Sequence, residues 1–175
     1  MAVRPILVAG NPVLRQKTRR VSKIDKSIQT LIDDMIETMR AAPGVGLAAT
    51  QVGVPLRIAV IEVDDVVTVL INPEIVKLGE PAEKDEGCLS VPGYWGKITR
   101  AETAVVKARD RHGKEIRVKG DGLLAQALQH EIDHLEGTLY IDRIEDQSLI
   151  QRVDSPSERP SRKRNELEAL SLKGE

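Results

Sequence analysis

The stretch QHEIDHLEG, residues 129–137, holds two of the chain's three histidines, with Glu131 directly after His130. On an α-helix, side chains four residues apart differ by about 40° around the axis, so the imidazoles of His130 and His134 project from one face. Two such imidazoles can bind one metal ion, and the adjacent carboxylate can reach a water at that ion without being a ligand. The stretch therefore predicts a metal site with a general base, rather than a solvated helix face on which His and Glu coincide.

The residues before this stretch predict the helix that carries it. Asp121 can cap the start of the helix, and Gly137 can stop it. Apolar residues recur between them at helical spacing, at Leu123, Leu124, Ala127, Leu128, Ile132 and Leu135.

A catalytic metal site needs a third protein ligand and an open position for water. A third histidine in the pattern H-E-x-x-H-x-x-G-x-x-H is absent, because that position holds Tyr140. A carboxylate from residues 142–146 would need another helix in a short stretch of chain. Cys88, in the turn-rich segment 79–97, is the remaining candidate, although a lone cysteine is more often a buried small hydrophobe.

Hydrophobic residues make up 41% of the 175 positions, which predicts one globular domain with an aliphatic core, since aromatic residues are few. An apolar stripe predicts a helix from Ser27 to about Ala41, capped by Asp25 or Ser27. Strands are expected at 57–63 and 66–73, and a hairpin at 102–120 with His112-Gly113 at its tip. Strands grouped between helices predict an α+β fold, with mainly antiparallel sheets packed around the helix that carries HEIDH.

The composition changes near residue 154, so we expect a domain at 1–153 and a polar tail at 154–175, disordered or forming a short helix. The net charge of −1 argues against specific DNA binding and against a nucleic-acid surface spread over the whole domain. The N-terminal stretch has no apolar run long enough for a signal peptide, and no window approaches the ~20 apolar residues of a membrane span. We therefore expect a cytoplasmic protein without membrane contact.

Three segments together resemble a known family. In order and spacing, GVGLAATQ (44–51), EGCLS (86–90) and QHEIDH (129–134) are similar to the three signature motifs of bacterial peptide deformylases. NPVLR (11–15) and INP (71–73) also resemble that family, and the resemblance runs from about residue 5 to 150.

The resemblance implies that Cys88, His130 and His134 bind one divalent metal, with water in the fourth position. It implies Fe(II) as the physiological metal, with Zn, Ni or Co able to substitute. The implied reaction removes the formyl group from the N-terminal formylmethionine of newly synthesised polypeptides and releases formate. Glu131 then serves as general base, and the Gln51 amide and the Leu89 backbone N–H stabilise the oxyanion. By residue type alone, Gln51 would be a surface-loop residue.

In this family the substrate peptide lies extended along the first motif, so Gly44, Val45 and Gly46 are expected to contact it through their backbone. The methionine side chain needs an unbranched apolar pocket, which we expect Leu89, Leu123, Ala127 and the face of His130 to line. These residues can equally be plain core residues. Two positions depart from better-known members of the family. Some members carry an arginine where this chain has Trp95, and an aliphatic pocket residue is common where this chain has Gln126.

Two alternatives stay open at this stage. A metallopeptidase that cuts internal peptide bonds would take a carboxylate or a later histidine as third ligand, and Cys88 argues against it. A metal-stabilised binding module would need four protein ligands and would have no use for Glu131. The basic run Arg159, Arg162, Lys163 and Arg164 is either a solvated end or a weak attachment to the ribosome.

Overall fold

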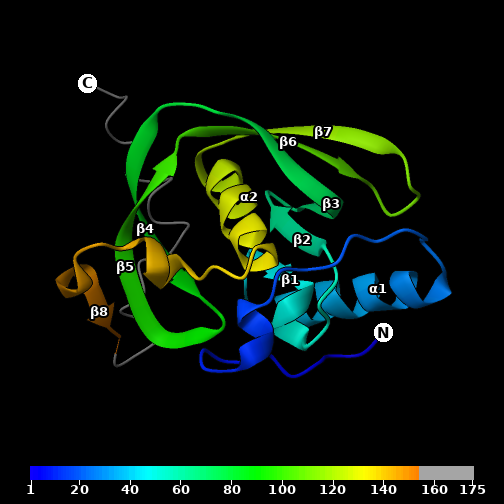
Figure 1. Ribbon diagram of the computed structural model, residues 1–175, viewed down its shortest axis with the longest axis horizontal. Helices are drawn as coiled ribbons and strands as arrows, with labels where there is room; N and C mark the ends of the chain where they lie inside the picture. Colours follow the sequence, from blue (N-terminus) through cyan, green and yellow to red (C-terminus); the bar gives the residue numbers. More distant parts are fainter. Residues whose placement is uncertain (154–175) are drawn as a thin grey trace.

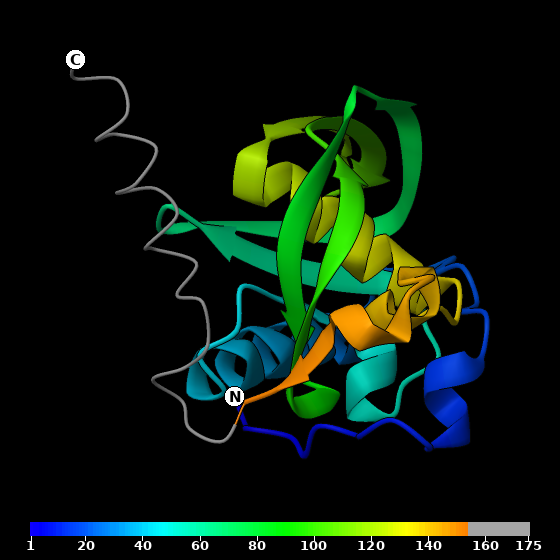
Figure 2. The same cartoon turned by 90° about the vertical axis from the view of Figure 1, so that its left-hand side faces the viewer.

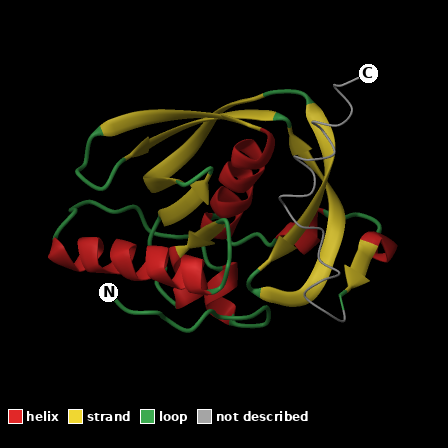
Figure 3. Cartoon of the chain, turned by 180° about the vertical axis from the view of Figure 1, so that it is seen from behind, coloured by secondary structure: helices red, strands yellow, loops and turns green. Residues whose placement is uncertain are grey.

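The computed structural model describes residues 1–153, so the tail predicted at 154–175 lies outside the described residues. Two antiparallel sheets surround a central helix, as the α+β prediction required (Figure 1). One sheet has the strand order β1-β2-β3-β6-β7, and the other has the order β4-β5-β8. Seen from behind, helix α1 (Lys26–Ala41) lies beside the larger sheet, where it contacts strands β1 and β2 (Figure 3).

The elements follow one another along the chain with these bounds: η1 (Pro12–Arg15), α1 (Lys26–Ala41), β1 (Gly46–Ala48), η2 (Ala49–Val52), β2 (Ile58–Val63), β3 (Val66–Leu78), β4 (Pro81–Cys88), β5 (Val91–Ala101), β6 (Thr103–Arg109), β7 (Glu115–Asp121), α2 (Gly122–Leu135), η3 (Tyr140–Arg143), η4 (Gln147–Leu149) and β8 (Ile150–Arg152).

Helix α1 forms where its apolar stripe predicted it. The Asp25 side chain accepts a hydrogen bond from the Ile28 N–H at 3.1 Å, which satisfies a donor that the first turn leaves unpaired. The helix ends just before Pro43. Its fully buried Ile32, Met35 and Met39 pack against residues of β1 and β2, and this aliphatic cluster forms one half of the core.

Two tight hairpins build most of the larger sheet. Asp64 and Asp65 join β2 to β3 with φ of 53° and 60°, the backbone that a two-residue hairpin turn requires and that Asp tolerates. Gly113 has φ of +83° at the tip of the β6–β7 hairpin. Both hairpins confirm their predicted strand pairs.

The segment predicted to be turn-rich, residues 79–97, instead belongs largely to the long strands β4 and β5. These pair from Pro81↔Ala101 to Cys88↔Val91, and the turn is confined to Leu89 and Ser90. Two glycines inside β5 have separate reasons: Gly93 has φ of +81°, and Gly96 has no room for a side chain. A Cβ on Gly96 would lie 2.6 Å from Ile144 Cδ1.

Helix α2 carries HEIDH through the centre of the molecule (Figure 2). Its residues 125–135 are all buried. Its polar residues are buried too, because β-strands and the segment after the helix cover it from several sides. Gly137 ends the helix with φ of +78°, as predicted. Asp121 stands at the N-cap position, but its side chain makes no capping hydrogen bond, so that part of the prediction is wrong.

The N-terminal segment connects two of the motifs. The Leu7 N–H donates to the Gln51 carbonyl at 2.8 Å, and the Ala9 N–H donates to the Ser90 carbonyl at 2.7 Å. These bonds fix the first motif against the turn that follows Cys88. Within residues 1–153, no helix has the length and apolar character needed to cross a membrane.

Candidate metal centre

Cys88, His130 and His134 meet inside the protein. Cys88 lies at the end of β4, and the two histidines lie one turn apart on α2. The Cys88 Sγ and the His134 Nε2 are 3.2 Å apart, and the two Nε2 atoms are also 3.2 Å apart. All three candidate ligand atoms lie within 4.8 Å of one another. Cys88, which the sequence indicated by elimination as the third ligand, therefore lies beside the two histidines.

This donor set fits a divalent transition metal. With metal–sulfur and metal–nitrogen distances of about 2.3 and 2.0–2.1 Å, tetrahedral ligand atoms would be separated by roughly 3.3–3.6 Å. The observed 3.2 Å separations are close to that range. One thiolate and two imidazoles suit iron, zinc, cobalt or nickel better than calcium or magnesium, which prefer oxygen.

A buried ionic network orients His130. The Glu86 Oε1 contacts the His130 Nδ1, which leaves the Nε2 facing Cys88 and His134. The Arg100 guanidinium forms two hydrogen bonds to Glu86, of 3.0 and 2.6 Å, and a third to the Asp133 Oδ2 at 2.6 Å. Carboxylate–histidine pairs of this kind fix the imidazole orientation in metal sites.

Burial and charge act on these groups in opposite directions. Burial favours neutral Glu86, but His130 and Arg100 outweigh it and hold the pKa of Glu86 far below its ordinary value. Burial also opposes a charge on Arg100, yet Glu86 and Asp133 raise the Arg100 pKa. Burial, together with the neighbouring His130, lowers the pKa of His134, which keeps its imidazole in the neutral form that binds metals.

Burial likewise lowers the pKa of His130, but the Glu86 carboxylate more than compensates and raises that pKa well above the ordinary value. The Glu86 carboxylate therefore favours positive charge at this imidazole, whether a proton or a metal ion supplies it.

Glu131 is buried beside the first motif, where Gly46 makes room for it. A Cβ on Gly46 would lie 2.5 Å from the Glu131 Oε1, and a Cβ on Gly44 would lie 2.7 Å from the Leu89 Cδ1. The close approach predicted from the glycines is thus made by two candidate site residues. Contact of the same glycines with a substrate stays a prediction.

Gln51 is 1% exposed, so the expectation of a surface-loop residue from its type alone is wrong. Its Oε1 accepts a hydrogen bond from the Ala48 N–H at 2.9 Å. Its Nε2 donates to the Ser90 Oγ at 3.1 Å and lies 3.7 Å from the Cys88 Sγ. Because both ends are held, the amide stays fixed next to the sulfur.

The predicted methionine pocket is less clearly assembled. Leu89 packs against the core cluster of α1 and β2, whereas Val45 packs with Ala127 in the cluster between α2 and β6. Leu123 is half-buried at the start of α2. Gln126 turns toward β4, where its Nε2 donates to the Asp85 carbonyl at 2.9 Å and to the Glu86 Oε2 at 3.1 Å.

Sequence patterns missed Glu86, Arg100 and Asp133 as site residues. Glu86 and Asp133 stand inside the quoted motifs EGCLS and HEIDH, so their positions offered a signal. Arg100 offered none, because an arginine in a strand is ordinarily exposed. Only the packing of β5 against α2 shows that it is 4% exposed.

Comparisons with a family model and with known proteins all match this chain to the same family. The family model described as polypeptide deformylase matches residues 3–149. A peptide deformylase of Dehalococcoides mccartyi (strain CBDB1) is 54% identical over 162 residues, covering 91% of this chain and 97% of the relative. One from Thermomicrobium roseum is 47% identical over 167 residues, covering 90% and 95%.

Solved structures agree with these relatives. The crystal structure of a peptide deformylase from Legionella pneumophila has 43% identity and a TM-score of 0.80, covering 98% of both chains. That of Ehrlichia chaffeensis peptide deformylase in complex with actinonin has 41% identity and a TM-score of 0.82, covering 85% of this chain and 92% of the other. The matched region contains all three segments that converge at Cys88, His130 and His134, and the chain belongs to the polypeptide deformylase family.

Proposed function

We propose that Cys88, His130 and His134 hold one divalent metal and that Glu131 acts as general base in the family's reaction. The enzyme is a peptide deformylase, which hydrolyses the formyl amide of N-terminal formylmethionine on new polypeptides and releases formate. One observation carries the assignment of residues: a thiol sulfur and two imidazole nitrogens converge, and the residue after the first histidine is a buried glutamate.

We further propose Fe(II) as the metal in the cell, with Zn, Ni or Co able to replace it. When bound, a divalent cation lowers the pKa of water toward neutrality and withdraws charge from a carbonyl oxygen. A sulfur ligand also makes the site sensitive to oxidants. Proton transfer and stabilisation of the oxyanion are carried out by groups of the protein itself.

Glu131 accepts a proton from the attacking water and delivers it to the departing amine, so one carboxylate serves as base and then as acid. Negative charge develops on the formyl oxygen as its carbon becomes tetrahedral. The Gln51 Nε2 and the Leu89 backbone N–H are the donors for that charge. Gln51 suits this role because its amide does not ionise, and because the Ala48 N–H and the Ser90 hydroxyl hold it in place.

The substrate peptide extends along Gly44, Val45 and Gly46 in this proposal, with its methionine side chain near Leu89, Leu123 and Ala127. The partners are N-formylmethionyl nascent peptides in the cytoplasm. Attachment to the ribosome through residues 154–175 would be weak and salt-sensitive.

Formate release from a formyl-Met tripeptide, with and without chelator, tests the assignment. Glu131→Gln should keep the metal content and lose activity on the order of a hundredfold or more, because the amide cannot accept the proton. Glu136→Gln is the matched control near the end of α2, since its carboxylate pairs with Arg57. Normal turnover by Glu131→Gln would exclude Glu131 as the base. In contrast, Cys88→Ser should lower the metal content, since a hydroxyl is a poorer and harder ligand.

A further inference from the structure

The outer face of the β6–β7 hairpin carries four exposed cations, Lys107, Arg109, Arg117 and Lys119. They alternate along each strand with residues that point inward, so all four lie on one face. None forms an ion pair within residues 1–153, whereas most other arginines described there do. This group is named the hairpin cations. Carboxylates stand opposite two of its members in the ladder, Glu115 opposite Arg109 and Glu74 of β3 opposite Lys107.

The register makes the charge more concentrated. Lys107 stands directly opposite Arg117 on one side and Glu74 of β3 on the other, and Lys119 stands opposite Val105. Lys77 of β3 faces Val105 from the other side, which adds a fifth exposed cation. Like charges placed directly across two strands destabilise a sheet. An anion bound over this face would offset the repulsion between Lys107 and Arg117.

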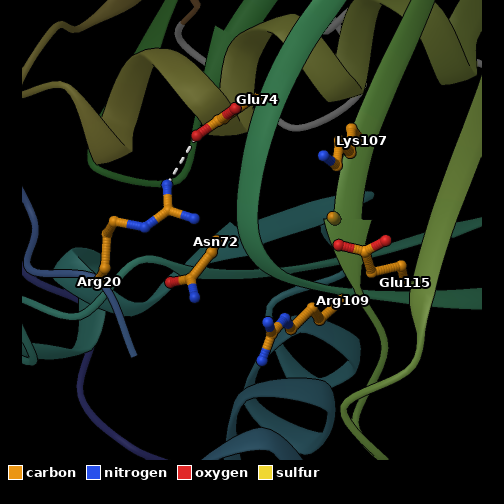
Figure 4. A pocket seen from close by; sticks show the side chains of 7 residues that line it. Arg20, Asn72, Glu74, Lys107, Arg109 and Glu115 are labelled. Carbon is orange, nitrogen blue, oxygen red and sulfur yellow. Dashed lines mark hydrogen bonds and ion pairs between the residues drawn. The ribbon is translucent and has the colours of Figure 1, made fainter. Parts of the chain in front are cut away.

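A cavity of about 210 Å³ continues this face toward β3 and the N-terminal segment (Figure 4). Lys107 and Arg109 line it together with Arg20, which is held 2.7 Å from the Glu74 Oε1. That pair neutralises Glu74. On the hairpin itself, Glu115 also lines the cavity and stands opposite Arg109, and Asp121 lies at the far end of β7.

We propose that the hairpin cations, with Lys77, form a docking surface for the phosphate backbone of RNA. Cations two residues apart on a strand are separated by about 6.8 Å, and neighbouring strands by about 4.8 Å, so the charges follow an extended polyanion rather than one small phosphate. The described aromatic residues, Tyr94, Trp95 and Tyr140, lie on β5 and η3. Binding therefore uses phosphates without base stacking and is independent of sequence.

The choice of RNA over other polyanions rests on the proposed function, because a nascent formylated chain emerges beside RNA. An enzyme held there by many weak phosphate contacts would be close to its substrate and would still exchange rapidly. The net charge of −1 agrees with a local surface rather than a general attraction.

The test measures binding of the full chain to a fluorescent 20-nucleotide RNA by anisotropy across a salt series. The double variant Lys107→Gln, Arg117→Gln loses two contacts, which should lower the salt slope by about 1.4 and the affinity at 0.1 M salt by about 25-fold. The control Lys23→Gln, Lys26→Gln removes the same charge from exposed cations before and at the start of α1, and it should bind like wild type.

Equal RNA affinity of the hairpin variant and wild type would overturn the proposal, and so would an equal loss in the control. Loss of binding to anionic phospholipid vesicles, with RNA binding unchanged, would assign the surface to a membrane instead. Formyl-Met tripeptide turnover should be unchanged in both variants. Failure of the proposed function would appear separately, as absence of formate release by the wild-type enzyme.

Discussion

Replacing Glu86 by glutamine tests how the buried network prepares the metal centre. The carboxylate contacts the His130 Nδ1 with one oxygen and accepts two hydrogen bonds from Arg100. An amide of the same size has only one acceptor oxygen, and Arg100 donates to both oxygens of Glu86. The new NH₂ group must therefore face an Arg100 donor in either orientation, and in one of them it also faces the His130 Nδ1. Since outer partners of ligating histidines typically contribute 10–100-fold to metal affinity, we expect a loss of about that size.

The same change should lower the free energy of unfolding by about 3 kcal/mol, because Arg100 keeps Asp133 but loses its other buried carboxylate. A typical domain is stable by about 5–15 kcal/mol, so the variant should still fold. Urea unfolding of the metal-free protein measures this loss. Competition with a chelator for Zn(II) or Ni(II) measures the affinity.

Asp133→Asn is the matched control for this experiment. Asp133 pairs with Arg100 and Arg143 and has no hydrogen bond to His130 among those of residues 1–153. It should therefore lower stability without a comparable loss of metal affinity. If Glu86→Gln bound metal as tightly as wild type, or no more weakly than Asp133→Asn, the contact to His130 would have no role in preparing the site.

Three further changes test other parts of the fold. Gly46→Ala should displace Glu131 and reduce turnover by on the order of 10–100-fold at normal metal content, and unchanged kcat would refute the close contact. Gly137→Ala should lower the free energy of unfolding by at least 1–3 kcal/mol, measured in urea, because φ is +78° and the new Cβ would meet a backbone carbonyl at 2.5 Å. Arg4 holds the pKa of Asp34 below its ordinary value, so the native state binds fewer protons there than the unfolded chain. The stability that ionised Asp34 contributes is present above its unfolded pKa and is lost as pH falls through its folded pKa. Asp34→Asn should therefore lower the free energy of unfolding at pH 7 and match wild type in strong acid, as measured by urea unfolding at both pH values.

The sequence by itself determined the local elements and the chemistry of the centre. Helix α1, the β2–β3 and β6–β7 hairpins and the end of α2 follow from periodicity, capping and turn residues, which act over a few neighbouring positions. The spacing of His130 and His134 places two ligands on one helical face for the same reason. Cys88 followed by elimination, since few other side chains offered a suitable ligand.

Only the tertiary structure decided what surrounds those residues. Glycines in β4 and β5 suggested turns, yet both segments are strands, and Gly96 admits Ile144 from a later part of the chain. Gln51 and Arg100 have polar side chains that local sequence assigns to the surface. They are buried because Cys88, Ser90, Glu86 and Asp133 supply partners from other elements. Burial and ion pairing of such groups depend on long-range packing, which no local pattern encodes.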